Sequence, residues 1–178
     1  METKVLLVLL HSVTYLITFT CYGTHLHGDE SGSVDKLHNV PGMRLVDPDP
    51  GRLRAAIGRM TQAPNGLDAC KREIVLTSIG EVCSFKSWDL LAAHVRSNHV
   101  HVVVSSTEKP DKVMNAFKAY ASRKLNQCAL DAPCRRWTRH GSTRYLWDRE
   151  QVEAAIAYVI DGQGKPMAVY RSFTVAAQ

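Results

Sequence analysis

Residues 98–126 read NHVHVVVSSTEKPDKVMNAFKAYASRKLN, and this stretch decides the fold of the chain. It opens with His99 and His101, which one valine separates, inside a run of valines that favours a β-strand. Successive side chains of a strand point to opposite faces, so both histidines fall on one face and the alternating valines on the other. One face therefore has the composition of a core, and the other carries groups that can do chemistry.

The same stretch continues into a helix that begins near Pro110. Proline suits the first turn of a helix, and Asp111 complements the positive end of the helix dipole. An apolar stripe follows at helical spacing and comprises Val113, Met114, Phe117, Ala121 and Leu125. Tyr120 and Lys124 lie one turn apart at the edge of this stripe. Packing can hold the ring of Tyr120 there while its hydroxyl is presented, and Lys124 can favour ionisation of a phenol whose ordinary pKa is about 10.

Two histidines on a strand followed by a tyrosine on a basic helix resemble the HUH-type single-tyrosine transposases, especially the REP-associated tyrosine transposases and their insertion-sequence relatives. The residues that carry the resemblance are Asn98-His99-Val100-His101, Lys118-Ala119-Tyr120, the strand end at residues 20–24 and the segment from Trp137 to Trp147. The resemblance implies that His99 and His101 hold a divalent metal, Mg or Mn, and that Tyr120 attacks a phosphodiester of single-stranded or hairpin DNA. The attack would form a covalent 5′-phosphotyrosine and free a 3′-hydroxyl.

The sequence does not decide which residue would be the third metal ligand. The family often has Gln or Asn one turn after the tyrosine, and this chain has Lys124 there. A two-residue hairpin at residues 97–98 pairs residue 94 with residue 101, which places His94 beside His101 as a third ligand, a partner of a ligand or a cross-strand neighbour. A rival pair, His25 and His27, ranks lower because neighbouring glycines argue against the rigid presentation that a catalytic metal needs.

The charge of the chain suits a polyanionic partner. Its net charge is +5 and its isoelectric point is near 9.0. The residues predicted to contact DNA are Lys118, Arg123, Arg135, Arg136, Arg139, His140 and Arg144. Three nearby aromatic residues, Trp137, Tyr145 and Trp147, are candidates for stacking on unpaired bases, and we expect some of them to belong to the core instead.

The whole chain, residues 1–178, is predicted to form a single α/β (α+β) domain, since its 45% hydrophobic content suffices for one core. The pattern predicts a central first strand over residues 12–22, helices capped by Asp49, Asp68 and Asp148, and a strand over residues 89–96. Residues 23–50 are predicted to be a long loop and residues 165–178 a tail. We expect a ferredoxin-like antiparallel sheet packed with helices, with its valine face on helices and its histidine face towards the helix of Tyr120.

Several classes of protein are disfavoured. Five cysteines without CxxC spacing indicate neither a disulfide framework nor a zinc knuckle. No apolar run approaches the roughly 18 residues that a membrane span needs, and the short apolar run near the N-terminus falls short of a signal peptide. The sequence therefore predicts a cytoplasmic protein without a membrane partner.

The predicted function is that of a transposase, a metal-dependent endonuclease and strand transferase that acts on single-stranded DNA. Whether Tyr120 serves the histidines of its own chain or those of a partner in a homodimer stays open. One alternative is a replication-initiator or relaxase-like HUH nickase, which shares the two histidines. The other is a non-catalytic nucleic-acid-binding module.

Overall fold

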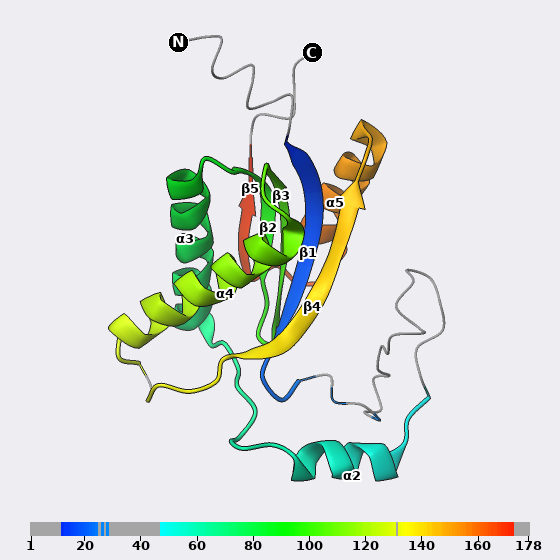
Figure 1. Cartoon of the computed structure of the whole chain (residues 1–178), viewed down its shortest axis with the longest axis vertical. Helices are drawn as coiled ribbons and strands as arrows, with labels where there is room; N and C mark the ends of the chain where they lie inside the picture. Colours follow the sequence, from blue (N-terminus) through cyan, green and yellow to red (C-terminus); the bar gives the residue numbers. More distant parts are fainter. Residues whose placement is uncertain (1–11, 25, 27, 29–46, 131, 173–178) are drawn as a thin grey trace.

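The computed structural model describes residues 12–24, 26, 28, 47–130 and 132–172. Within these residues the strands are β1 (Val13–Cys21), β2 (Asp89–Val95), β3 (His99–Ser106), β4 (Trp137–Leu146) and β5 (Ala168–Arg171). The helices are α2 (Pro50–Gly58), α3 (Ala69–Lys86), α4 (Pro110–Gln127) and α5 (Arg149–Ile160) (Figure 1). None of these helices is both long and apolar enough to cross a membrane.

The strands form one sheet in the order β4-β1-β3-β2-β5, and every neighbouring pair is antiparallel. The order of the first four strands, with α3 between β1 and β2 and α4 between β3 and β4, is the ferredoxin-like arrangement. The predicted fold class, a single α+β domain on an antiparallel sheet, is therefore confirmed. The prediction of a tail from residue 165 is wrong in part, because residues 168–171 form β5 along β2.

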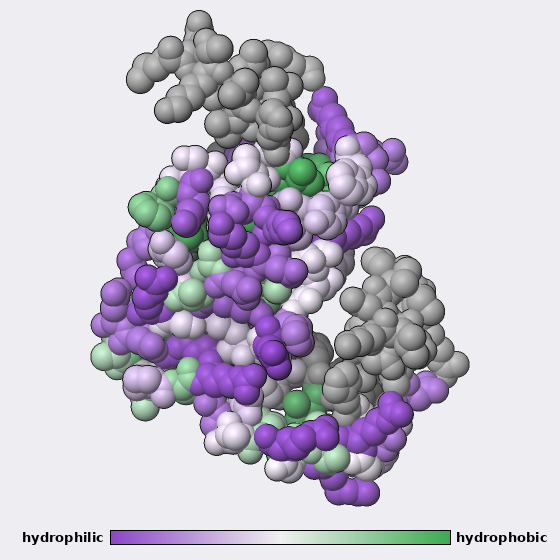
Figure 2. Space-filling view, in the orientation of Figure 1, coloured by the Kyte–Doolittle hydropathy of each residue, from purple (hydrophilic) through white to green (hydrophobic). Residues whose placement is uncertain are grey.

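Helices cover both faces of the sheet (Figure 1). On one face, α3 and α4 pack against Val100, Val102 and Val104 of β3 in the larger core. On the other face, α5 packs against Ala92 of β2 and Val103 of β3 in a smaller core. Figure 2 shows mainly hydrophilic side chains over the outer surface of α4, as its amphipathic pattern requires.

The prediction that the histidine face is turned towards the helix of Tyr120 is wrong. The histidines alternate with the valines, so they share the face that α5 covers. Two physical reasons place α4 on the valine face. Its apolar stripe must be buried against apolar side chains, and right-handed crossovers put α3 and α4 on the same side of the sheet.

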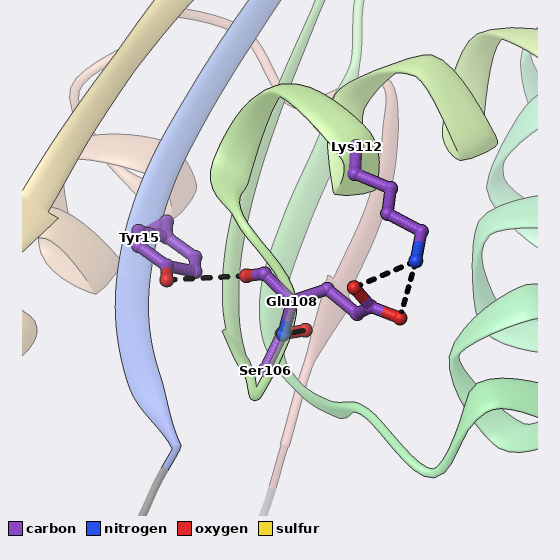
Figure 3. Close-up of polar contacts among 4 residues, drawn as sticks. All are labelled: Tyr15, Ser106, Glu108 and Lys112. Carbon is purple, nitrogen blue, oxygen red and sulfur yellow. Dashed lines mark hydrogen bonds and ion pairs between the residues drawn. The ribbon is translucent and has the colours of Figure 1, made fainter.

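The turn between β3 and α4 is fixed by hydrogen bonds rather than by a side-chain cap, because Lys109 at the N-cap position makes no capping bond. The Glu108 amide donates to Ser106 Oγ at 2.9 Å, and the Tyr15 hydroxyl donates to the Glu108 carbonyl at 3.2 Å. The Glu108 carboxylate also pairs with Lys112 at 2.7 Å (Figure 3). These contacts tie the start of α4 to β1 and β3.

The predicted helix caps and hairpin register are confirmed. Asp49, Asp68 and Asp148 each accept a hydrogen bond from the first turn of their helix. In the β2–β3 hairpin, His94 is the partner of His101, and the Arg96 amide donates to the His99 carbonyl at 2.8 Å. On the other side of β3, His101 has Thr18 of β1 as its partner. His101 therefore lies between His94 and Thr18 on the face that α5 covers.

Candidate active site

The two histidines of β3 lie side by side, with ring centroids 4.8 Å apart and ring planes at 76°. His99 Nδ1 lies 2.7 Å from Asn98 Oδ1. An amide oxygen only accepts, so Nδ1 carries the proton and the lone pair of the ring is on Nε2. The Nδ1 atom of His101 lies 2.7 Å from the hydroxyl of Thr18, which can accept in the same way. Such bonds orient the imidazoles of metal sites.

His101 is suited to bind a metal at neutral pH. Its side chain is buried, and burial lowers its pKa to about 3, with a smaller contribution from the charge of His99. A hydrogen bond between the ring and the side chain of Gln163 raises the pKa and opposes this shift without reversing it. The ring is therefore neutral at physiological pH, which is the form that coordinates metal ions.

A tyrosine that the sequence analysis did not single out stands beside this pair. The ring of Tyr158 lies 5.5 Å from the ring of His101, centroid to centroid, at an interplanar angle of 74°. Tyr158 belongs to the last turn of α5, whose residues Ala155, Ile156 and Val159 are buried against the sheet. Its own side chain is 48% exposed. Its ring therefore contacts His101 on one side and is partly exposed to solvent.

Gln163 connects the tyrosine to the histidines. Its Nε2 donates to the Tyr158 carbonyl at 3.3 Å, and its side chain is hydrogen-bonded to His101. Among the described residues, no group of three or more His, Cys, Asp or Glu could hold a metal. Gln163 is an amide side chain that contacts His101 and could supply an oxygen ligand.

The sequence held a signal for this site. Tyr158 lies at the edge of an apolar stripe, as Tyr120 does, and Gln163 follows it by five residues. The resemblance expects Gln or Asn about one turn after the nucleophile. Tyr158 with Gln163 meets that expectation more closely than Tyr120 with Lys124.

Tyr120 and Lys124 do not approach the histidines within one molecule. Tyr120 packs against the core between α3, α4 and the sheet, and the Arg123 guanidinium lies over its ring at 4.6 Å. Lys124 Nζ pairs with the Glu81 carboxylate of α3 at 2.8 Å. The prediction that Tyr120 converges with the histidines of its own chain is wrong, because the sheet lies between them. An arrangement across a dimer is a separate proposal.

Two of the residues predicted to contact DNA are interior. Lys118 is buried, and its Nζ donates to the carbonyls of Thr138 at 3.0 Å and His140 at 3.1 Å, where β4 bulges away from β1. Burial lowers the pKa of Lys118 to about 8, so the ammonium is still charged at neutral pH. Arg136 is also buried, with Nη2 donating to Asn126 Oδ1 at 2.8 Å. For both residues the prediction of a surface phosphate contact is wrong.

The remaining predicted contacts are exposed: Arg123, Arg135, Arg139, His140 and Arg144. Arg144 of β4 has Leu16 as its partner in β1, and Leu16 packs in the core under α5. Paired residues of neighbouring strands point to the same face. Arg144 is therefore a basic residue on the face of the sheet that carries the histidines.

The three aromatic residues divide between core and surface. Trp137 is buried, and its Nε1 donates to the Lys118 carbonyl at 3.1 Å and to Ser122 Oγ at 3.0 Å. Tyr145 and Trp147 are exposed and stacked on each other, with centroids 5.1 Å apart and planes at 13°. The latter two are the aromatic residues of this set that an unpaired base can reach.

The ring of His94 already makes two hydrogen bonds. Both ring nitrogens of His94 are used, since Nδ1 lies 2.9 Å from the Val159 carbonyl and Nε2 accepts from the Met167 amide at 3.2 Å. His94 is therefore not placed as a third ligand, although its predicted place beside His101 is confirmed. The rival pair, His25 and His27, lies outside the described residues.

Residues 67–150 match the family described as "Transposase IS200 like". The resemblance to the IS200-like transposases is confirmed. The segment matched to IS200-like transposases contains His99, His101 and Tyr120 and ends before Tyr158.

One solved structure that the chain is similar to is a REP-associated tyrosine transposase bound to a REP hairpin, with 10% sequence identity and a TM-score of 0.48. The likeness covers 83% of this chain and 64% of that chain. No curated protein matches the sequence.

Proposed function

We propose that the protein is a transposase that cleaves and rejoins single-stranded DNA through a covalent bond to Tyr158, with a divalent metal held by His99 and His101. One observation carries this proposal. The Tyr158 ring stands 5.5 Å from the His101 ring, on the sheet face that both histidines share. The match to IS200-like transposases supports the reaction class.

The donor set fits a divalent ion. His99 and His101 would supply two neutral imidazole nitrogens, and Gln163 would supply an amide oxygen. Mg²⁺ prefers oxygen ligands, so two nitrogen ligands favour Mn²⁺. The bound ion would polarise the scissile phosphate and offset its charge.

Tyr158 would be the nucleophile. Its phenolate oxygen forms a bond to phosphorus, the bond from phosphorus to the 3′-oxygen breaks, and that oxygen leaves as a 3′-hydroxyl after taking up a proton. The product is a 5′-phosphotyrosine. Because this diester keeps the energy of the broken bond, a second 3′-hydroxyl can reverse the step and join strands without ATP.

Exposed cations would hold the DNA strand. Arg144 lies on the histidine face, and Arg135, Arg139, His140 and Arg123 are the other exposed residues of the predicted set. Contacts between such residues and phosphates depend on salt and carry no sequence information. A single strand or a DNA hairpin is therefore the proposed partner.

Three alternatives have distinct signatures. In a homodimer, Tyr120 of one chain could serve the histidines of its partner, and the cleavage would then depend on Tyr120 instead of Tyr158. A relaxase-like nickase would use the same histidines but prefer a replication origin. A non-catalytic binding module would form no covalent complex.

The proposal is tested by incubating the protein with 3′-end-labelled single-stranded DNA and Mn²⁺ and separating the products under denaturing conditions, since the fragment with the 3′ end stays bound to the protein. We expect a labelled complex that survives denaturation and that EDTA prevents, because the metal activates the phosphate. Duplex DNA of the same sequence is the control and should give little complex. If the purified protein binds single strands and never forms a covalent complex across a set of sequences and hairpins, it is a binding module.

The exposed aromatic stack gives a separate prediction about binding. Of the three tryptophans, Trp88 and Trp137 are each 7% exposed and Trp147 is 72% exposed. Stacking of a base on Trp147 should quench its fluorescence when oligothymidylate is added, and Trp147→Phe should remove most of the quenching. Trp147→Ala should weaken binding about 5- to 150-fold, the equivalent of about 1–3 kcal/mol for one stacked base. Quenching that persists in the Trp147→Phe protein would place the bases elsewhere.

A further inference from the structure

His94 is a buried histidine of β2 that the proposed chemistry does not use. Its ring is held from two sides: Nδ1 lies 2.9 Å from the Val159 carbonyl, and Nε2 is 3.2 Å from the Met167 amide, which donates to it. A carbonyl oxygen only accepts, so Nδ1 must carry the proton, and Nε2 is then the acceptor that Met167 needs. One neutral tautomer satisfies both bonds, and burial, which lowers the pKa of His94, favours that neutral form.

The two bonds lie at the two ends of a short segment, residues 160–166. Val159 directly follows Tyr158, and Met167 directly precedes β5. Gln163, which contacts His101, lies between them. His94 is therefore bonded to the chain on both sides of the residue that links the tyrosine to the histidines.

Packing holds this segment mainly at Ile160, which is partly buried against the small core under α5. None of residues 160–167 is buried, and Gly164 has a φ of +72°, which other residues adopt only with strain. Its other anchors are hydrogen bonds: Arg96 Nη1 donates to the Lys165 carbonyl at 2.7 Å, and the Gly162 amide donates to the Tyr158 carbonyl at 3.0 Å. Of these anchors, His94 is the one that ties both ends of the segment to the sheet beside His101.

We propose that His94 is a positioning residue that clamps residues 160–166 and so sets Tyr158 and Gln163 against His101. This inference rests on the proposed function for its catalytic consequence. The clamp itself is a property of the folded chain and can be measured without DNA.

Three substitutions separate the two bonds. His94→Asn places an amide nitrogen near the Nδ1 position and keeps a donor for the Val159 carbonyl. His94→Gln places an amide oxygen near the Nε2 position and keeps an acceptor for the Met167 amide. His94→Leu removes both bonds. Ser78→Ala is the matched control, because it removes a buried hydrogen bond to the Val75 carbonyl inside α3, on the opposite face of the sheet.

The first measurement is amide hydrogen exchange of the full chain without DNA. His94→Leu should raise exchange in peptides that cover residues 158–167 by about tenfold or more and leave α3 and α4 protected, because loss of a local anchor opens only the local unit. His94→Asn should raise exchange mainly around residue 167, and His94→Gln mainly around residue 160. Ser78→Ala should not change the segment. Unchanged exchange in the segment, or a uniform rise throughout the chain, would overturn the clamp.

The second measurement is the rate of covalent complex formation at saturating DNA. We expect His94→Leu to lower this rate about 10- to 100-fold, to raise the Mn²⁺ concentration for half-maximal rate and to leave DNA affinity unchanged. His94→Asn or His94→Gln should restore part of the rate, and either variant serves if His94→Leu does not fold. A normal rate in all three variants would overturn the positioning role. If the unaltered protein forms no covalent complex, the proposed function fails, while the exchange experiment still decides the clamp.

Discussion

Replacing Tyr158 with Phe is expected to abolish the covalent protein–DNA complex while single-stranded DNA still binds. Phenylalanine keeps the ring that lies 5.5 Å from His101 and removes only the hydroxyl, so the fold and the contacts of α5 should persist. Without the phenolic oxygen no bond to phosphorus can form, and a lost nucleophile is not replaced by its neighbours. The measurement is the amount of denaturation-resistant complex, with binding followed separately by fluorescence anisotropy.

Tyr120→Phe is the matched control. Tyr120 is also a partly exposed tyrosine at the edge of an amphipathic helix, but it lies on the opposite side of the sheet. Its substitution should leave the covalent complex intact. The reverse result, in which Tyr120→Phe abolishes the complex and Tyr158→Phe does not, would require a homodimer with the active site shared between chains. Mixing Tyr120→Phe protein with His101→Ala protein would then restore activity, because one mixed site would contain both intact groups.

Replacing His101 with Ala is expected to remove Mn²⁺-dependent cleavage. In the proposed site His101 would contribute one of two imidazole nitrogens, and its ring also contacts Tyr158 and Gln163. Loss of one of so few protein ligands should reduce the rate by at least about 100-fold, since loss of a group that merely orients a ligand already costs 10- to 100-fold. The measurement is the rate of complex formation across a Mn²⁺ titration, together with Mn²⁺ binding in the absence of DNA.

The control for His101→Ala is His140→Ala, which removes an exposed histidine of β4. It should leave the Mn²⁺ dependence unchanged and affect only DNA affinity. Because His101 is buried, thermal unfolding of the variant should be measured as well, and His101→Asn offers a smaller change in volume. Mn²⁺-dependent cleavage at the normal rate in a folded His101 variant would remove the metal site from the proposal.

Local patterns were sufficient for much of the fold. The alternation of His99, Val100 and His101 specifies two unlike faces of β3, because the period of a strand is two. The short hairpin at residues 97–98 specifies that His94 is the partner of His101, and this register is observed. The aspartates at positions 49, 68 and 148 mark helix starts, since their side chains accept bonds from the first turn. These features depend on residues that are close in sequence.

The candidate site could be predicted only in part. His99 and His101 were found because they interrupt an apolar strand. Tyr120 and Tyr158 both lie at the rim of an apolar helix stripe, so this helix pattern alone does not separate them. The burial of Lys118 could not be predicted from the local pattern either. Its ammonium donates to carbonyls of a β4 bulge about twenty residues later in the chain.

The sequence by itself determined the two faces of β3, the hairpin register, the caps and the apolar stripes, because each follows from the periodicity and hydrogen-bonding groups of neighbouring residues. Only the tertiary structure decided which helix covers which face. That choice depends on the handedness of the crossovers and on burying the stripe of α4 against the valines. It places Tyr158 of α5, and not Tyr120 of α4, beside the histidines.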